Sequence, residues 1–200
     1  MSEWRQIADV AETNPETLGA KTEPEYLFSY IDLGSVERGH IYWDSLQEFK
    51  FSDAPSRARR KVRPDDVLFG TVRPNLQSHG YVSDRRTGEL VASTGFSVIR
   101  PREDISNGKY LFFALLGHGI YGQSVNAAVG SNYPAVNDRD VRQFRIFTPP
   151  IEEQDRIAQI LDTLDTQIRQ TKALIGKLER IKQGLLTDLL TRGIDQNGQL

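Results

Sequence analysis

The residues best suited to chemistry lie in one basic third of the 200-residue chain. Residues 51–102 carry 10 basic and 5 acidic side chains, whereas residues 1–50 carry 4 basic and 10 acidic ones. The formal net charge of −2 conceals this asymmetry. Because a contiguous basic segment attracts phosphate groups, the pattern indicates nucleic acid as a candidate ligand.

The densest part of this basic third is the run Arg57-Ala-Arg-Arg-Lys-Val-Arg63, with five cations in seven residues. No amide side chain is interleaved with these cations, so we expect them to contact phosphates and to supply affinity rather than specificity. Two further arginines precede Gly88 in an expected hairpin turn. The predicted phosphate contacts are Arg57, Arg59, Arg60, Lys61, Arg63, Arg85 and Arg86.

Side chains that could read bases gather in two loops. One loop follows an expected strand that ends near Val72, and the other spans residues 126–133. Arg forms paired hydrogen bonds with guanine, and Asn and Gln form them with adenine. A solvated loop without a ligand is the alternative for each stretch. The candidate base or groove contacts are Arg73, Asn75, Gln77, Ser78, His79, Tyr81, Ser131, Asn132 and Tyr133.

Signals for catalysis are weak. The chain has no Cys, which excludes thiolate metal sites and Cys nucleophiles, and its three His residues are scattered. Asp65-Asp66 lacks the nearby Lys of a metal-dependent nuclease and suits a turn that enters a strand. Thr148-Pro-Pro-Ile151 differs from the Asn-Pro-Pro-Tyr signature of amino-methyltransferases, because Thr and Ile cannot hold a flipped base. We therefore expect no catalytic residue, no metal and no cofactor in this chain.

The sequence pattern changes at Pro149-Pro150. Before the prolines, short aromatic and β-branched runs punctuated by Gly, Pro, Asn and Asp predict strands, and two apolar or capped segments predict short helices. The expected strands lie near residues 26–31, 66–72, 96–99 and 143–147, and the expected helices at 109–117 and 138–141. Residues 1–148 are thus expected to form the mixed, β-rich domain of an α+β protein.

After the prolines the pattern is helical from Glu152 to Leu190, a length of about 58 Å. Apolar residues recur at steps of three and four, which is typical of a coiled-coil seam, and Thr171 and Lys182 occupy two of its positions. We expect one long helix over residues 149–192 and a polar tail or linker over 193–200. The seam consists of Ile157, Leu161, Leu164, Ile168, Ile175, Leu178, Leu185 and Leu189.

Such a helix exposes its apolar stripe unless another helix covers it. Packing against its own domain is the alternative, which the length of the helix disfavours. The seam indicates a coiled coil but does not identify the partner. A second copy of this chain is one candidate, and a helix of another protein is the other.

Four segments, in the same order, resemble the specificity (S) subunits of type I restriction-modification systems. They are Val62–Asn75, Ala92–Pro101, Pro149–Ala158 and Lys182–Leu190. Asp65 stands where that family usually has Gly. The resemblance covers nearly the whole chain, but it includes one recognition domain and one helix where a full-length subunit has two. The chain therefore resembles an N-terminal half of such a subunit.

The resemblance implies a DNA-binding subunit without catalysis of its own. In that family each recognition domain reads one half of a bipartite target in double-stranded DNA. The two long helices pair antiparallel, set the gap between the half-sites and dock the modification (methyltransferase) subunits. S-adenosylmethionine and ATP are then expected only on partner subunits, and the restriction subunit joins indirectly. The dimeric form implied for this chain is a homodimer through the helix or a pairing with a second recognition half.

Two other classes of function stay open at this point. A coiled-coil adaptor without sequence-specific DNA binding would use the same helix, and an enzyme acting on nucleic acid would need the motifs that are missing. No apolar run reaches the roughly 18 residues of a membrane span. The first residues lack a basic segment followed by an apolar one. A cytoplasmic protein is the resulting expectation.

Overall fold

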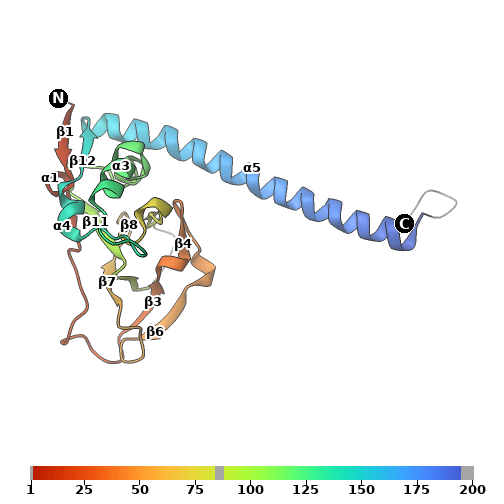
Figure 1. Ribbon diagram of the computed structural model, residues 1–200, viewed down its shortest axis with the longest axis horizontal. Coiled ribbons are helices and arrows are strands. Elements are labelled where there is room, and N and C mark those ends of the chain that lie inside the picture. The colour runs from red at the N-terminus through yellow and green to blue at the C-terminus, as the bar shows by residue number, and fades with distance from the viewer. Residues whose placement is uncertain (1, 84–87, 195–200) are drawn as a thin grey trace. The chain divides into compact units, whose positions relative to one another are not determined.

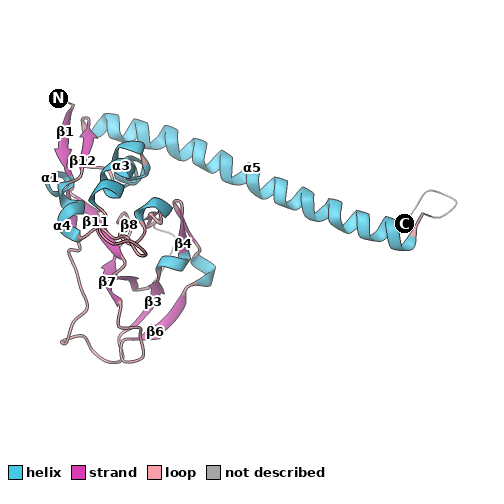
Figure 2. Ribbon diagram, viewed as in Figure 1, coloured by secondary structure: helices cyan, strands magenta, loops and turns pink. Residues whose placement is uncertain are grey.

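The structure is a computed structural model that describes residues 2–83 and 88–194. The chain divides into two compact units, Met1–Ala158 and Gln159–Leu200 (Figure 1). The first unit carries every described strand and all helices except the greater part of the last one (Figure 2). Within the described ranges no helix is long and apolar enough to cross a membrane.

The first unit consists of short strands and short helices. In chain order they are β1 (Glu3–Gln6), α1 (Ile7–Val10), β2 (Ala11–Thr13), β3 (Leu27–Ile31), η1 (Leu33–Ser35), β4 (Val36–Glu37), β5 (His40–Ile41), η2 (Trp43–Ser45), β6 (Gln47–Lys50), β7 (Ala58–Val62), β8 (Val67–Gly70), η3 (Pro74–Leu76), β9 (Gly80–Tyr81), β10 (Leu90–Ser93), β11 (Phe96–Pro101), α2 (Gly108–Leu116), α3 (His118–Ala127), α4 (Asp138–Gln143) and β12 (Arg145–Thr148). The long helix α5 (Ile151–Arg192) begins in this unit and continues into the second.

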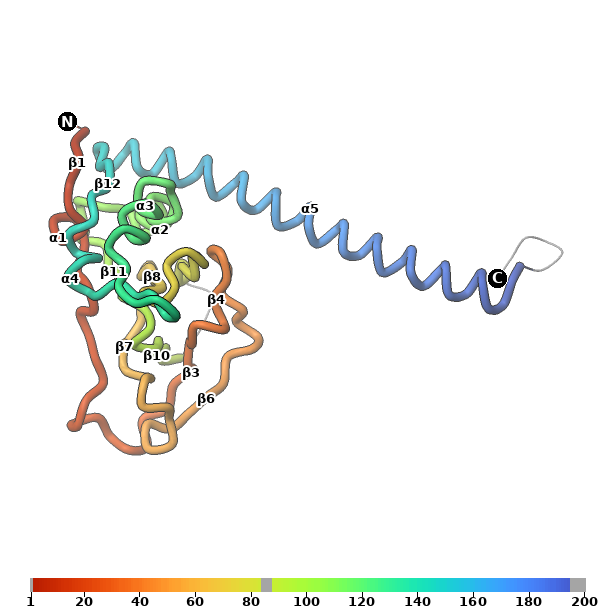
Figure 3. Tube along the Cα trace, viewed as in Figure 1, coloured from red at the N-terminus to blue at the C-terminus, as the bar shows by residue number. Residues whose placement is uncertain are grey.

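The strands form two four-stranded sheets and two ribbons. One sheet has the order β6-β3-β10-β7, in which β3 and β10 are parallel, and the other has the antiparallel order β2-β11-β8-β9. The ribbons are β4-β5 and β1-β12. Figure 3 traces β1 and β12 side by side although they lie near opposite ends of the first unit's sequence.

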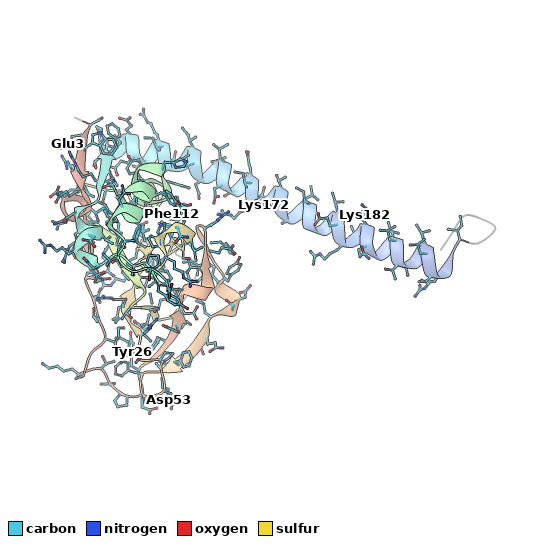
Figure 4. The ribbon with its side chains drawn as sticks, in the orientation of Figure 1. Glu3, Tyr26, Asp53, Phe112, Lys172 and Lys182 are labelled. Atoms are coloured by element: carbon cyan, nitrogen blue, oxygen red, sulfur yellow. The ribbon has the colours of Figure 1, made fainter. Side chains whose placement is uncertain are left out.

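Strand β8 is buried on both faces, which explains its uninterrupted apolar sequence. Side chains alternate across a strand. Val67 and Phe69 accordingly join the cluster beneath α1, α2, α3 and α4, whereas Leu68 joins the cluster shared with the other sheet. Figure 4 shows Phe112 of α2 among the side chains of the first unit. Two cores therefore meet at β8, and the loop that follows it starts from a rigid strand.

An ion-pair network anchors the entrance to β8. The Asp66 side chain is almost fully buried and accepts two hydrogen bonds of 2.8 Å from Arg100, while the Arg63 backbone N–H donates a third. Burial raises the pKa of the Asp66 carboxyl, and the hydrogen bonds from Arg100 oppose that shift. Asp65 has a φ of 72°, a left-handed conformation that favours Gly.

The start of α5 is fixed by one buried amide. Gln154 is fully buried, and its Nε2 donates hydrogen bonds of 3.0 Å to the Ile105 carbonyl and 2.8 Å to the Pro149 carbonyl. Its Oε1 accepts a hydrogen bond of 3.0 Å from the Asn107 backbone N–H. The amide thus joins the first turn of the helix to the segment that precedes α2.

The second unit contains the remainder of α5. The whole helix has 42 residues and runs without a break from residue 151 to residue 192. Its seam side chains from Leu161 to Leu189 are between 36% and 54% exposed. Figure 4 shows Lys172 and Lys182 on this helix. Lys182 stands at a seam position, where a charged residue weakens pairing while it fixes register.

The structure confirms the β-rich domain followed by a long helix. The expected helices correspond to α2 and α4, and the expected strands to β3, β8, β11 and β12. Most of the shorter strands and helices were not predicted, and β7 and α3 illustrate why. Strand β7 is the basic run itself, whose charges hide its strand character, and α3 has a sequence rich in Gly and polar residues that weakens the helical signal.

Candidate nucleic-acid interface

Strand β7 holds the basic run in an extended conformation, and most of its cations already have partners. Arg60 pairs with Asp138 at 3.0 Å, Lys61 with Glu89 at 3.3 Å and Arg63 with Glu16 at 2.8 Å. Arg59 lies over the ring of Phe51, 5.0 Å from its centroid. These contacts neutralise much of the charge, so the run attracts phosphates less strongly than its composition predicts.

Arg57 differs from the rest of the run. It precedes β7 and is exposed, and among the described residues it forms no ion pair. Arg57 lines a cavity of about 620 Å³. The walls combine cationic, hydroxyl, aromatic and aliphatic groups, and include Arg57, Arg73, Ser78, Tyr133, Leu33 and Leu76.

The cavity brings together two loops that are distant in the sequence. Val72 and Ala135 form an antiparallel bridge, and the backbone N–H of Arg73 donates a 2.7 Å hydrogen bond to the Pro134 carbonyl. Above this bridge the Arg73 guanidinium lies 4.3 Å from the centroid of the Tyr133 ring. Both predicted recognition loops therefore meet at one place, and a cation–π contact joins them.

The loop after β8 is held in an unusual backbone conformation. Arg73 and Gln77 both have a φ of 50°, and they flank the single turn of η3. Left-handed residues other than Gly cost free energy that the surrounding structure must supply, and they cluster at functional sites. The Gln77 side chain donates a 3.2 Å hydrogen bond to the Leu116 carbonyl, which ties this loop to the end of α2.

The structure places His79 in the core and not at the surface position that was expected for a base contact. His79 is 2% exposed, its ring stacks on Phe69 with centroids 4.2 Å apart, and its Nδ1 accepts a 3.1 Å hydrogen bond from the Gly70 N–H. Burial lowers the pKa of His79 to about 4, so the imidazole is neutral near pH 7. His79 is therefore a core residue that supports the loop from beneath.

Two other candidates are already engaged within the protein. The Tyr81 hydroxyl donates a 2.5 Å hydrogen bond to Asp65, and the Gln77 amide donates one to the Leu116 carbonyl. Asn75, Ser131, Asn132 and Tyr133 are exposed, as base contacts must be. Arg85 and Arg86 lie outside the described residues. The aliphatic cavity walls were not predicted, because an isolated Leu in a loop gives no sequence signal.

The described residues offer little for catalysis. In the ranges 2–83 and 88–194, no group of three or more His, Asp or Glu side chains could hold a metal ion. Asp66 is committed to Arg100 and Asp65 to Tyr81. The acids that could suggest a nuclease are thus parts of the scaffold that supports the loop after β8.

Comparison with known proteins identifies the family. Residues 59–180, more than half of the chain, match the model of the type I restriction modification DNA specificity domain. The HindI specificity subunit of Haemophilus influenzae is 24% identical over 92% of this chain and 40% of its own length. The putative MjaX specificity subunit of Methanocaldococcus jannaschii is 29% identical over 96% of this chain and 46% of its own length.

Solved structures agree. The HsdS subunit from Thermoanaerobacter tengcongensis is 31% identical and superposes with a TM-score of 0.74, over 96% of this chain and 49% of that one. A chain from a structure of type I R-M system assembly is 30% identical, with a TM-score of 0.77 over 100% of this chain and 51% of that one. The chain spans about half the length of these relatives. With its β-rich domain, long helix and matched motifs, the chain belongs to the type I restriction-modification DNA specificity family.

Proposed function

We propose that this chain is a sequence-specific recognition unit for double-stranded DNA that reads one half of a bipartite target in a type I restriction-modification complex. The family is non-catalytic, so recognition is the function that needs explanation. The observation that carries the proposal is the meeting of two exposed polar loops around the cavity at Arg57, Arg73 and Tyr133.

The distribution of charge supports this choice of face. Among the described residues, Arg57 and Arg73 have no acidic partner, whereas Arg60, Lys61 and Arg63 do. An unpaired guanidinium keeps its full attraction for a phosphate, and its release of counterions contributes to affinity. Asn75, Ser131 and Asn132 next to these cations are exposed and able to contact base edges.

The long helix provides the assembly function. Its seam is apolar and exposed, so a second helix that covers it gains about 1.5–3 kcal/mol per fully buried side chain. We propose an antiparallel pairing with a second copy of this chain or with a second recognition half. The paired helices then dock modification subunits, which bring S-adenosylmethionine, and through them the ATP-using restriction subunit. The complex acts in the cytoplasm.

A twofold dimer has a consequence for the target. The same face of each domain is repeated at the two ends of the helix pair, so a homodimer favours an inverted repeat. A pairing with a different recognition half favours two unrelated half-sites. The symmetry of the selected DNA therefore reports which partner covers the seam.

Duplex DNA binding at several salt concentrations tests the proposal. The purified full chain, with and without a modification subunit, is first used to select binding sequences from a random pool of DNA duplexes. The affinity for the enriched sequences is then measured by fluorescence anisotropy from 50 to 200 mM salt. We expect an enriched half-site and an affinity that falls steeply with salt. A coiled-coil adaptor predicts helix pairing without enrichment of any sequence, and that outcome would contradict DNA recognition.

A further inference from the structure

The cavity at Arg57, Arg73 and Tyr133 has a shape that direct groove reading does not explain. Base edges inside a duplex lie at the bottom of a groove, so the side chains that read them must protrude from the protein. Here Arg73 and Ser78 line a hollow of about 620 Å³. This volume lies within the range of about 300–1,000 Å³ that is typical of small-ligand pockets.

The lining of the cavity has two kinds of surface. Arg57 and Arg73 provide positive charge that no described acidic residue neutralises, and Ser78 provides a hydroxyl. Leu33, Leu76 and the Tyr133 ring provide apolar walls. A phosphate alone needs only the first kind of surface, and an apolar ligand only the second. A nucleotide, which joins a phosphate to a flat base, needs both.

The aromatic wall is held in place before any ligand binds. Tyr133 is 69% exposed, and the Arg73 guanidinium lies 4.3 Å from the centroid of its ring. Hydrogen bonds from the Arg73 N–H to Pro134 and from the Leu76 N–H to the Arg73 carbonyl fix the backbone beneath it. An unpaired base can stack on a preformed aromatic surface of this kind, and the stacking free energy offsets part of the free-energy cost of leaving the duplex.

We infer that this cavity receives one nucleotide that has left the base stack of the bound DNA. Its phosphate lies at Arg57 and Arg73, and its base rests against Tyr133 and the leucine wall. This inference rests on the DNA-binding function proposed above. It concerns a different kind of contact from groove reading, because the extruded nucleotide makes its contacts outside the duplex.

The sign of a mismatch effect separates the two kinds of contact. A mismatch at a pair that is read in the groove weakens binding, whereas a mismatch at a pair that opens lowers the cost of unstacking and tightens binding. We expect one position of the selected half-site at which a mismatch tightens binding, on the order of tenfold. The measurement is anisotropy with a duplex series that carries one mismatch at each position in turn.

Four variants connect that position to the cavity. Tyr133→Ser and Arg73→Asn are expected to abolish the gain from the mismatch, and Asn is chosen because it tolerates the left-handed backbone. Tyr133→Phe keeps the ring and should keep the gain. Arg59→Ala removes one positive charge, as Arg73→Asn does, but Arg59 lies on β7 outside the cavity wall, so this variant should weaken all duplexes alike and keep the gain.

The outcomes are distinguishable. If every mismatch weakens binding to the wild-type chain, or if Tyr133→Ser keeps the gain, the extruded nucleotide is refuted while DNA recognition stands. If free dAMP binds with dependence on Arg57 and Arg73 but no mismatch tightens the duplex, the site takes a free nucleotide and the inference is again overturned. If no duplex binds at all, the proposed function itself fails. Bright 2-aminopurine fluorescence next to the tightening mismatch supports the inference independently.

Discussion

The two units of this chain bury their apolar side chains to opposite extents. In the first unit Phe69 and Phe96 are fully buried between sheets and helices, whereas in the second unit Leu164 and Leu178 are 50% and 54% exposed. Both units use the same residue types, so the difference lies in what covers them. The domain completes its own core, whereas the helix leaves an apolar stripe exposed, and the proposed pairing with another helix would cover that stripe.

The largest expected effect concerns the exposed seam. Leu164→Asp combined with Leu178→Asp places four carboxylates in the seam of a dimer and removes four apolar contacts, each worth about 1.5–3 kcal/mol. We expect dimer dissociation to rise by more than about a thousandfold. Sedimentation at micromolar concentration measures this change, and the thermal unfolding of the domain should be unaltered.

A matched variant on the outer face of the same helix controls for helix propensity. Thr166→Asp with Ala173→Asp introduces the same charges at positions that face away from the seam. This variant should remain dimeric. A wild-type chain that sediments as a strict monomer would refute self-association and leave a different recognition half as the partner.

The next effect concerns the buried ion pair of the domain. Asp66→Ala leaves the Arg100 guanidinium, whose side chain is 19% exposed, with only Glu16 as an acidic partner. Removal of one member of a buried pair costs about 3–5 kcal/mol. We expect a loss near the lower end of that range, because Glu16 still compensates part of the charge. Urea denaturation measures it, and an equal loss for Arg63→Ala would argue against the central role of Asp66.

A change in pH acts on the same domain through His79. Its pKa is about 4 in the folded chain and 6.5 in the unfolded one, so the unfolded chain takes up a proton first as the pH falls. The contribution of neutral, buried His79 to the free energy of unfolding is fully present above pH 6.5. It is lost progressively between pH 6.5 and pH 4, by about 3 kcal/mol in total. His79→Asn should flatten the pH dependence of unfolding in this window. An unchanged slope would show that His79 is not the group responsible.

The sequence predicted best those elements whose structure follows from their local sequence pattern alone. The heptad seam predicted α5 to within two residues at each end, and the alternation in β12 matches its alternating burial. The effective charge of the run from Arg57 to Arg63 could not be judged from the sequence, for a tertiary reason. Its acidic partners Glu16, Glu89 and Asp138 lie far away in the sequence, so the neutralisation of the run becomes visible only in the fold.

The candidate site has the same limitation. The two recognition loops were identifiable from their side chains, but their meeting at Arg73 and Tyr133 depends on the bridge between Val72 and Ala135. His79 could be assigned to the core only after its place beneath the loop was known, because the sequence around a single His between polar residues is equally compatible with an exposed position. The residue types identify candidate DNA-contacting residues, and the topology of the fold determines which of them lie together at the surface.

The smallest expected effect tests whether the two units behave independently. Gln154→Met keeps the volume of the side chain but leaves the Ile105 and Pro149 carbonyls and the Asn107 N–H without their partner. Only the hydrogen bond to the Pro149 carbonyl is fully buried, whereas the other two are part-buried, so that water can replace them. One buried unsatisfied group costs about 1–3 kcal/mol, so the domain should lose about 2 kcal/mol of unfolding free energy. The dimer constant should not change, because Gln154 is buried in the first unit and does not lie on the seam. A parallel loss of dimer affinity in sedimentation would show that the start of α5 and its seam act as one element.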